Sequence, residues 1–296
     1  MLLCSRLQLI AACALVLAGG ASALPRAIQV GTYVWTGEDP HFGGFSGFDL
    51  DADGLGFVTI SDSAAIYAGR LSRDEMGVVT GVASGDPIVP PSHHGTPVAH
   101  PMDDAEGLAI RPDGTLFVSY ETHNRIAEYR DGGKTWVKEF WPTVFRLLPL
   151  NKGIEALAIA GDGALYALPE AFGRIGDPIP VFRLRDGALK TPFTLRRDGG
   201  WQPVGADFGP DGRLYVLERD FWPFIGFMSR ARRITLAGDT VSADEILFET
   251  SAGVHDNLEG IAVWQDESGA IRLTMISDDN FLPVQRTEIV DYRIVE

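Results

Sequence analysis

Residues 106–121, EGLAIRPDGTLFVSYE, hold the pattern that decides the fold. A short alternating apolar run is followed by an Asp-Gly turn and then by a second apolar run that ends in an acidic residue. Asp-Gly between alternating hydrophobic residues is a strong signal for a β-hairpin. The stretch therefore predicts two antiparallel strands, with Glu106 opening the first strand and Glu121 closing the second.

The same unit recurs four more times along the chain. The copies are SGFDLDADGLGFVTISD from Ser46, EALAIAGDGALYALPE from Glu155, VGADFGPDGRLYVLER from Val204 and EGIAVWQDESGAIRLTMISDD from Glu259. Successive copies start 49 to 60 residues apart. This period is typical of the four-stranded blades of a β-propeller.

The residues after each hairpin supply the outer strands of a blade. Residues 125–129 and 180–184 are predicted third strands, and residues 136–140 and 245–248 are predicted fourth strands. Because no segment keeps a 3.6-residue apolar period, long helices are not expected. The prediction is an all-β propeller with five detectable four-stranded repeats; a degenerate sixth blade within 72–104 leaves the count at five or six.

Both ends of the chain bear on how the ring and the protein are organised. Arg6 precedes an apolar stretch, and Ala21-Ser22-Ala23 is a small-x-small cleavage signal, so residues 1–23 are predicted to be a signal peptide. A rival interpretation is lipoprotein cleavage at Cys13. Residues 24–296 are then a single propeller domain in a periplasmic or secreted protein, whose first strand, 27–30, pairs with the C-terminal blade and closes the ring.

Composition excludes several classes of function. Cys4 and Cys13 both lie in the predicted signal peptide, so disulfides, thiol nucleophiles and thiolate metal sites are excluded from the mature chain. A formal net charge of −15 disfavours binding to nucleic acid or to anionic membranes. No second apolar stretch is long enough to span a membrane. We expect a monomer whose partner is a small-molecule ester.

Acidic residues recur at the two ends of each hairpin. In a propeller these ends lie on the same face, so the acids are expected to converge on a central funnel. The closing acids are Asp62, Glu121, Glu170, Glu218 and Asp278, and the opening acids are Glu106, Glu155 and Glu259. One interpretation is that they are solvated strand ends or bonds between blades. The other is that converging carboxylates bind Ca²⁺ or another hard divalent cation, with a predicted ligand set of Asp62, Glu106, Glu121, Glu170, Glu218, Asp278, Asp279 and Asn280.

Four arginines follow the closing acids: Arg125, Arg174, Arg219 and Arg286. Each arginine either forms a salt bridge with an acid or uses its planar guanidinium group to bind a phosphate or carboxylate of the ligand. Arg219 directly follows Glu218 and so points to the other side of its strand, which makes it the weakest of the four as a funnel residue.

Several segments in order carry a family resemblance: GGFSGFDLD, DAEGLAIRPDG, LLPLNKGIEALAI, DGRLYVLERDF, DNLEGIAV and ISDDNF. From about Gly43 to Tyr292 the chain resembles the phytase-like family, exported bacterial proteins described as having esterase-like activity. The resemblance implies a hydrolase whose active-site acids correspond to Glu106, Glu121, Glu155, Glu170, Glu218, Glu259, Asp278 and Asp279.

Three functional hypotheses follow. The first is a metal-dependent hydrolase of phosphate esters or diesters, in which Glu155 or Glu259 is the general base and Arg125 and Arg174 stabilise charge on the phosphoryl group. The second is a Ca²⁺-dependent lactonase or carboxylic esterase that uses the same funnel. The third is a non-enzymatic periplasmic binding propeller, which the aromatic segment 221–227 favours.

Overall fold

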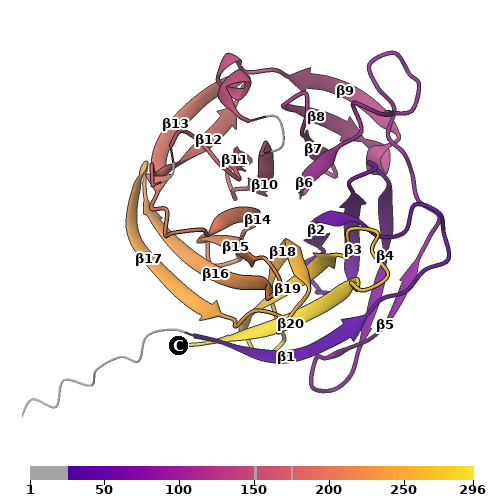
Figure 1. Ribbon diagram of the computed structural model, residues 1–296, viewed down its shortest axis with the longest axis vertical. Helices are drawn as coiled ribbons and strands as arrows, with labels where there is room; N and C mark the ends of the chain where they lie inside the picture. The colour runs from indigo at the N-terminus through magenta and orange to yellow at the C-terminus, as the bar shows by residue number, and fades with distance from the viewer. Residues whose placement is uncertain (1–25, 150–151, 175) are drawn as a thin grey trace, which may run out of the picture.

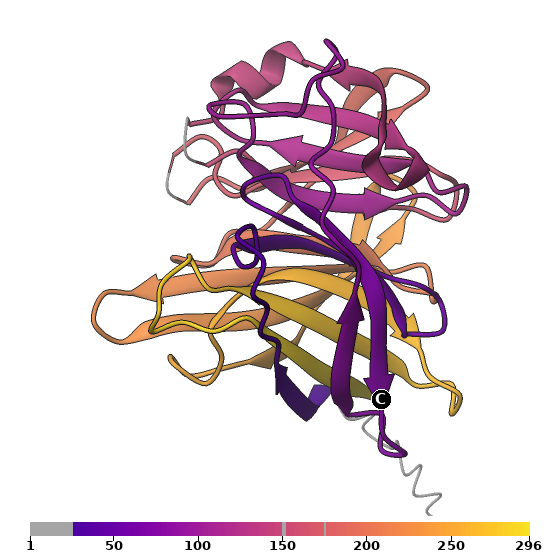
Figure 2. The same cartoon turned by 90° about the vertical axis from the view of Figure 1, so that its right-hand side faces the viewer.

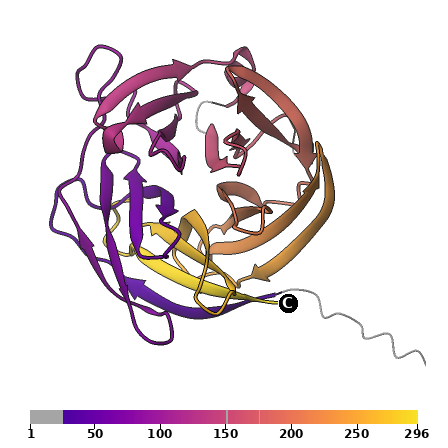
Figure 3. The same cartoon turned by 180° about the vertical axis from the view of Figure 1, so that it is seen from behind.

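Five four-stranded antiparallel sheets surround a central axis in the computed structural model, which describes residues 26–149, 152–174 and 176–296 (Figure 1). The predicted all-β propeller is confirmed, with five blades. The innermost strands of all five blades surround the axis when the ring is viewed from either face (Figures 1 and 3). The predicted signal peptide, residues 1–23, lies outside the described residues.

The blades follow the repeats in order. Blade 1 consists of β2 (Phe45–Leu50), β3 (Gly56–Ser61), β4 (Ile66–Arg73) and β5 (Val79–Ser84). Blade 2 consists of β6 (Ala105–Ile110), β7 (Leu116–Tyr120), β8 (Arg125–Arg130) and β9 (Thr135–Phe140), with the short 3₁₀ helix η1 (Asp131–Gly133) between β8 and β9. Blade 3 follows η2 (Thr143–Leu147) and consists of β10 (Ile154–Ile159), β11 (Leu165–Pro169), β12 (Ile179–Arg185) and β13 (Ala188–Leu195).

The last two blades complete the ring. Blade 4 consists of β14 (Gln202–Phe208), β15 (Leu214–Trp222), β16 (Gly226–Ala237) and β17 (Thr240–Glu249). Blade 5 consists of β18 (Asn257–Gln265), β19 (Ile271–Asp278), β20 (Glu288–Val295) and, as its outer strand, β1 (Arg26–Val34). Because β1 pairs antiparallel with β20, with Ala27 opposite Ile294, the N-terminal strand closes the ring as predicted.

Residues 72–104 do not form a sixth blade. The segment contributes the end of β4 and all of β5 to blade 1, and then runs as irregular chain with isolated bridges such as Ile66–Ile88 and Pro91–Pro97. Its proline-rich sequence explains this, because proline lacks the N–H that a central strand must donate.

Apolar side chains fill the space between neighbouring blades. One such cluster joins blades 1 and 5 through Trp35, Phe45, Phe57, Ile276 and Ile289. Close to the axis the inner strands approach one another so tightly that glycine is required: a Cβ on Gly205 would lie 2.3 Å from the carbonyl oxygen of Glu259 in the next blade. The recurring glycine of the repeat is therefore a packing residue of the ring.

The connections of each blade lie on two faces of the ring (Figure 2). The hairpin between the second and third strands of a blade lies on the same face as the loop that enters its first strand, since antiparallel strands alternate in direction. We call this the funnel face. Among the described residues, no helix is both long and apolar enough to cross a membrane.

Candidate functional site

A cavity of about 240 Å³ lies on the funnel face at the central axis. All five blades contribute to it. Its lining consists of Asp62, Glu106, Glu121, Lys152, Glu155, Glu170, Arg219, Glu259, Asp278 and Asn280. The predicted convergence therefore occurs for seven of the eight opening and closing acids, all except Glu218, and two cations, Lys152 and Arg219, lie among them. We call this cavity the funnel.

A β-bulge positions the opening side chain of every blade. The register between first and second strands shifts at the opening residue: Ile154 pairs with Pro169 and Ala156 with Leu168, which leaves Glu155 without a partner. The same shift leaves Glu259 unpaired in blade 5. A β-bulge changes the direction of the side chain of the extra residue. These carboxylates therefore point to the axis and do not follow the regular alternation of side chains along the strand.

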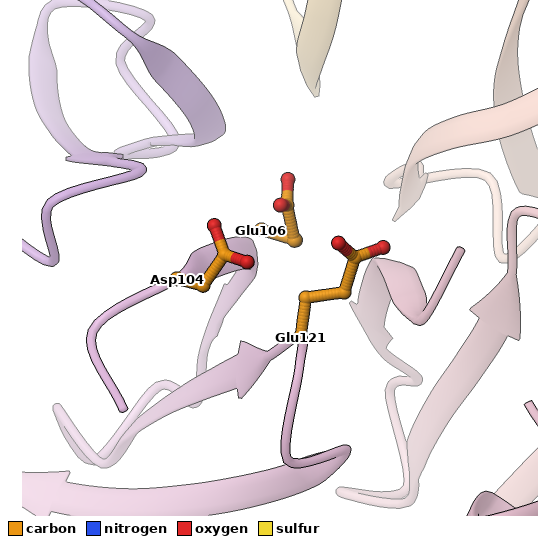
Figure 4. A group of neighbouring side chains, drawn as sticks. All are labelled: Asp104, Glu106 and Glu121. Carbon is orange, nitrogen blue, oxygen red and sulfur yellow. The ribbon is translucent and has the colours of Figure 1, made fainter. Parts of the chain in front are cut away.

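Three carboxylates at blade 2 form a tight oxygen cluster. Asp104, Glu106 and Glu121 each place a carboxylate oxygen within 4.8 Å of the others, and Figure 4 shows the three side chains next to one another. Sequence analysis missed Asp104, although its position two residues before the opening Glu106 was a usable signal. Oxygen donors of this kind suit a hard cation such as Ca²⁺, which takes six to eight oxygens, so the cluster fits part of a calcium site.

Two cations line the funnel beside Glu170. Lys152 Nζ donates to Glu170 Oε2 at 3.0 Å. Arg219 donates to Glu259, and its Nη2 lies 3.4 Å from Glu170 Oε1. Although burial by itself lowers the pKa of Arg219, the carboxylates of Glu259 and Glu170 hold that pKa above its usual value, so the guanidinium stays charged. The funnel therefore contains both a group of clustered carboxylates and two cations that are paired with acids.

An amide organises the acids next to Arg219. Asn257 Oδ1 accepts from Arg219 Nη1 at 2.9 Å, while Asn257 Nδ2 donates to Glu259 Oε1 at 2.8 Å and to Asp278 Oδ2 at 3.1 Å. In the neighbouring blade 1, Ser46 Oγ donates to Asp62 Oδ1 at 2.5 Å. Much of the negative charge in this part of the funnel is thus met by donors of the protein itself.

Crowding raises the pKa of several funnel acids. Burial, followed by repulsion from Glu170, Glu121 and Glu259, raises the pKa of Glu155 well above its usual value. Burial and repulsion from Glu155 do the same to the pKa of Glu106. The carboxyl groups of Glu155 and Glu121 are hydrogen-bonded to each other.

Two further acids are shifted in the same direction. Burial and repulsion from Asp278 raise the pKa of Asp62, and burial and repulsion from Glu259 raise that of Asp278 to about 7. A set of carboxylates in which burial and like charge disfavour ionisation is a good receptor for a cation.

Glu218 does not line the funnel, and Arg219 takes its expected place. Pro203 pairs with Glu218 in blade 4, as Ile154 pairs with Pro169 in blade 3, so Arg219 is the equivalent of Glu170. Glu218 instead accepts from Arg230 Nε at 2.5 Å and from Arg232 Nη1 at 2.7 Å in a buried ion network. The prediction was displaced by one residue, which moves a strand side chain to the other face. Counting fifteen residues from the opening position, as in blades 2 and 3, would have identified Arg219.

The two arginines predicted to bind a phosphoryl group also lie outside the funnel lining. Arg125 is buried in blade 2, where its guanidinium lies 4.0 Å from the ring centroid of Tyr120 and its Nη2 donates to Met102 O at 2.6 Å. Arg174 is exposed in the loop between β11 and β12. Packing holds Arg125 in a structural role, whereas Arg174 lies on the funnel face in a β11–β12 loop that does not line the cavity.

Asp279, a predicted metal ligand, points away from the funnel. Its Oδ1 accepts from the backbone N–H groups of Gly44 and Phe281, both at 3.0 Å, and its Oδ2 accepts from Thr287 Oγ1 at 3.1 Å. It organises the turn after β19, while Asp278 and Asn280 on either side of it line the funnel. Arg286 is exposed and pairs with Glu288, 2.7 Å away.

Comparisons with known proteins agree with the fold and identify the family. An aldose sugar dehydrogenase from Streptomyces coelicolor, solved in its PQQ-bound form, covers 92% of this chain and 100% of its own at 15% identity and a TM-score of 0.51. An α-L-arabinofuranosidase from Podospora anserina, in complex with cellotriose, covers 92% of this chain and 98% of its own at 9% identity and a TM-score of 0.53. These likenesses concern the fold alone.

No curated protein sequence matches the chain. A family model described as "Phytase-like: Esterase-like activity of phytase" matches residues 40–281, which include all ten residues of the funnel lining. Because that match spans most of the chain, the protein belongs to the phytase-like family.

Proposed function

We propose that the protein is an exported, metal-dependent hydrolase of phosphate esters or diesters and that the funnel is its active site. The observation that carries the proposal is that an oxygen cluster, formed by Asp104, Glu106 and Glu121, and two cations, Lys152 and Arg219, occur together at the funnel. A cation site next to fixed positive side chains suits an anionic ester. The family's description supports hydrolysis of an ester.

The oxygen cluster would hold the metal ion. Asp104, Glu106 and Glu121 come from one blade, so a single packed sheet sets their spacing. The backbone N–H of Gly153 donates to Glu121 Oε1 at 2.7 Å, which leaves the other oxygen of that carboxylate for the cation. A bound Ca²⁺ supplies a Lewis acid that neutralises phosphate oxygens and makes a water molecule more acidic.

Lys152 and Arg219 bind and orient the phosphate. Their present partners are Glu170 and Glu259, and a doubly charged phosphate competes well for the same donors. Arg219 presents a planar fork to phosphate oxygens, whereas Lys152 provides a flexible point charge. Both cations remain in place as negative charge develops on the phosphoryl group, which lowers the barrier.

Glu155 is the general base in this proposal. Its carboxylate projects from a bulge, lies between the oxygen cluster and the cations in the blade order, and has a raised pKa caused by burial and neighbouring carboxylates. A carboxylate of raised pKa is a stronger proton acceptor than an ordinary one. Glu259, the other candidate, is engaged by Arg219 and Asn257 and serves to hold Arg219.

The test is hydrolysis of chromogenic phosphate monoesters, phosphate diesters and carboxylate esters by residues 24–296, with Ca²⁺ and with chelator. Phosphate-ester turnover that chelator abolishes is expected. Glu155→Gln should lower kcat by roughly 10²–10⁴-fold, as loss of a general base does. The matched control is Glu75→Gln, an exposed acid in the turn between β4 and β5.

The other outcomes point to the alternatives. Turnover of carboxylate esters alone would replace the proposal by a Ca²⁺-dependent lactonase or esterase that uses the same oxygens to polarise a carbonyl. If none of the three classes of ester is hydrolysed, a non-enzymatic binding propeller is favoured. The β15–β16 hairpin favours that alternative, because Trp222 is half exposed and Phe224 is fully exposed at its tip.

A further inference from the structure

The turn that follows β19 separates two cavities. Asp278 and Asn280 line the funnel, whereas Asp279 and Phe281 line a second cavity of about 440 Å³ on the same face. Asn280 has φ 48° and Phe281 has φ 51°, so two consecutive side-chain-bearing residues adopt the left-handed conformation. Such strain persists only where surrounding contacts impose it, and it is concentrated at functional sites.

The second cavity is an apolar groove between the chain before β2 and the turn after β19. Its apolar lining consists of Val34, Trp35, Phe42, Phe281, Leu282 and Pro283. Trp35 is buried and rigidly held, since it stacks on Phe45 with ring centroids 5.1 Å apart and meets Phe42 edge-on at 4.9 Å. By contrast, Phe281 is 53% exposed and Leu282 is 49% exposed. The groove therefore has a fixed aromatic floor and an apolar wall that water still reaches.

The groove and the funnel share a wall. A Cβ placed on Gly44 would lie 2.5 Å from the ring of Phe281 and 3.4 Å from the carboxylate of Asp62, a funnel acid. The ring of Phe281 and the carboxylate of Asp62 thus both lie close to the backbone of Gly44. At this point little more than the backbone of Gly44 separates the funnel from the groove.

We propose that this groove binds the apolar substituent, alkyl or aryl, of the ester whose charged group enters the funnel. The inference rests on the proposed function and adds a class of substrate to it. That class is an amphiphilic ester with an apolar alkyl or aryl substituent next to the bond that is hydrolysed. The volume of the groove is that of a small-ligand pocket, whose walls are mostly apolar and whose few polar groups fix orientation. Phe281 and Leu282 are specificity residues in this arrangement.

Non-hydrolysable phosphonates test the inference without turnover. Binding of methylphosphonate, hexylphosphonate and phenylphosphonate to residues 24–296 with Ca²⁺ is measured by calorimetry. Each methylene that becomes buried should tighten binding by about fourfold, so hexylphosphonate should bind at least tenfold more tightly than methylphosphonate.

Two variants and a control locate the effect. Leu282→Ala and Phe281→Ala should reduce the advantage of hexylphosphonate severalfold and leave methylphosphonate unchanged. Phe224→Ala removes a fully exposed ring from the β15–β16 hairpin, outside the groove, and should change neither affinity.

Each contrary outcome has a distinct meaning. If methylphosphonate and hexylphosphonate bind equally, or if Leu282→Ala and Phe281→Ala do not alter their ratio, the groove is not a substrate subsite and the proposed function is untouched. If no phosphonate binds in the presence of Ca²⁺, the proposed phosphate-ester function fails and the assignment of the groove falls with it.

Discussion

Arg219 of blade 4 occupies the strand position that Glu170 occupies in blade 3, and the two side chains meet in the funnel with Arg219 Nη2 3.4 Å from Glu170 Oε1. One blade thus presents a cation where its neighbour presents an acid. This exchange breaks the symmetry of the repeat and places a positive charge in what would otherwise be a ring of closing acids.

The first prediction concerns this cation. Arg219→Gln removes one positive charge beside Glu259 and Glu170, so Ca²⁺ should bind more tightly while phosphate esters bind and react less well. A loss in kcat/KM of roughly 10²–10³-fold is expected for a charge-stabilising group. Calorimetry with Ca²⁺ and steady-state kinetics check the two effects.

Arg219→Lys is the matched variant. It keeps the charge but loses the planar fork, so its Ca²⁺ affinity should stay near that of the wild type and its kcat/KM should fall between the two. If Arg219→Gln changes both affinities in the same direction, its effect is on the packing of the funnel and not on its charge.

The second prediction concerns the oxygen cluster. Asp104→Asn keeps an oxygen to accept from Thr122 Oγ1, which lies 3.0 Å from Asp104 Oδ2, but removes the charge that a cation requires. Ca²⁺ at about 100 times its Kd stabilises a protein with one site by about 2.7 kcal/mol. The corresponding rise of Tm, about 5 °C or more for a chain of this size, should be present in the wild type and reduced in Asp104→Asn.

Asp103→Asn is the control for that experiment, because it makes the same charge change one residue away and outside the oxygen cluster. It should retain the Ca²⁺-dependent rise in Tm, which differential scanning calorimetry measures. An equal loss in both variants would contradict a metal site at Asp104.

The third prediction concerns two acids at the opposite end of the axis. There an apolar cavity of about 430 Å³ is lined by residues that include Asp49 and Asp207. Asp49 Oδ2 accepts from the backbone N–H of Ile110 at 3.0 Å, and Asp207 Oδ2 accepts from that of Val263 at 2.6 Å. Each carboxyl therefore ties its blade to the inner strand of the next.

Burial raises the pKa of Asp49 to about 7, and burial followed by repulsion from Asp49 raises the pKa of Asp207. A raised carboxyl pKa means that the folded state holds its proton more tightly than the unfolded state. The resulting stability is present below pH 4 and is lost as the pH rises through 7.

Asp49→Asn keeps the acceptor for Ile110 and removes the ionisation. The variant should match the wild type at pH 4 and exceed it at pH 8 by roughly 2–4 kcal/mol in free energy of unfolding, since one unit of pKa is worth about 1.4 kcal/mol. Urea unfolding at both pH values checks this. Asp86→Asn, at an exposed position, should show no such pH-dependent gain.

The fourth prediction concerns the shared wall of funnel and groove. Gly44 has φ 60°, and a Cβ there would collide with the ring of Phe281. Gly44→Ala should therefore cost about 1–3 kcal/mol of stability and displace Phe281. Gly95→Ala is the matched control, because Gly95 also has a positive φ, of 77°, but its Cβ would meet open space.

Thermal unfolding and phosphonate binding distinguish the two glycine variants. Both should lose stability through backbone strain, but only Gly44→Ala should also lose the preference for hexylphosphonate over methylphosphonate. If the two variants behave alike in both measurements, Phe281 does not depend on the close approach at Gly44.

The sequence by itself determined the architecture, because every signal for it is local. The Asp-Gly turns and alternating apolar runs specify hairpins, their period specifies blades, and strand 27–30 had only the C-terminal blade left to pair with. The gathering of Glu106, Glu155 and Glu259 on one face also followed from the repeat, since antiparallel strands return to the face from which they start.

Only the tertiary structure decided which side chains enter the funnel. A strand shows its side chains to alternate faces, so a displacement of one residue exchanged Arg219 for Glu218. The β-bulges at Glu155 and Glu259 turn these two side chains toward the funnel. The regular alternation of a strand would not predict that direction. Arg125 stacks on Tyr120 and donates a hydrogen bond to Met102 O. These contacts depend on the packing of a whole blade. The groove beside Phe281 joins segments from opposite ends of the chain, and the closure of the ring brings them together.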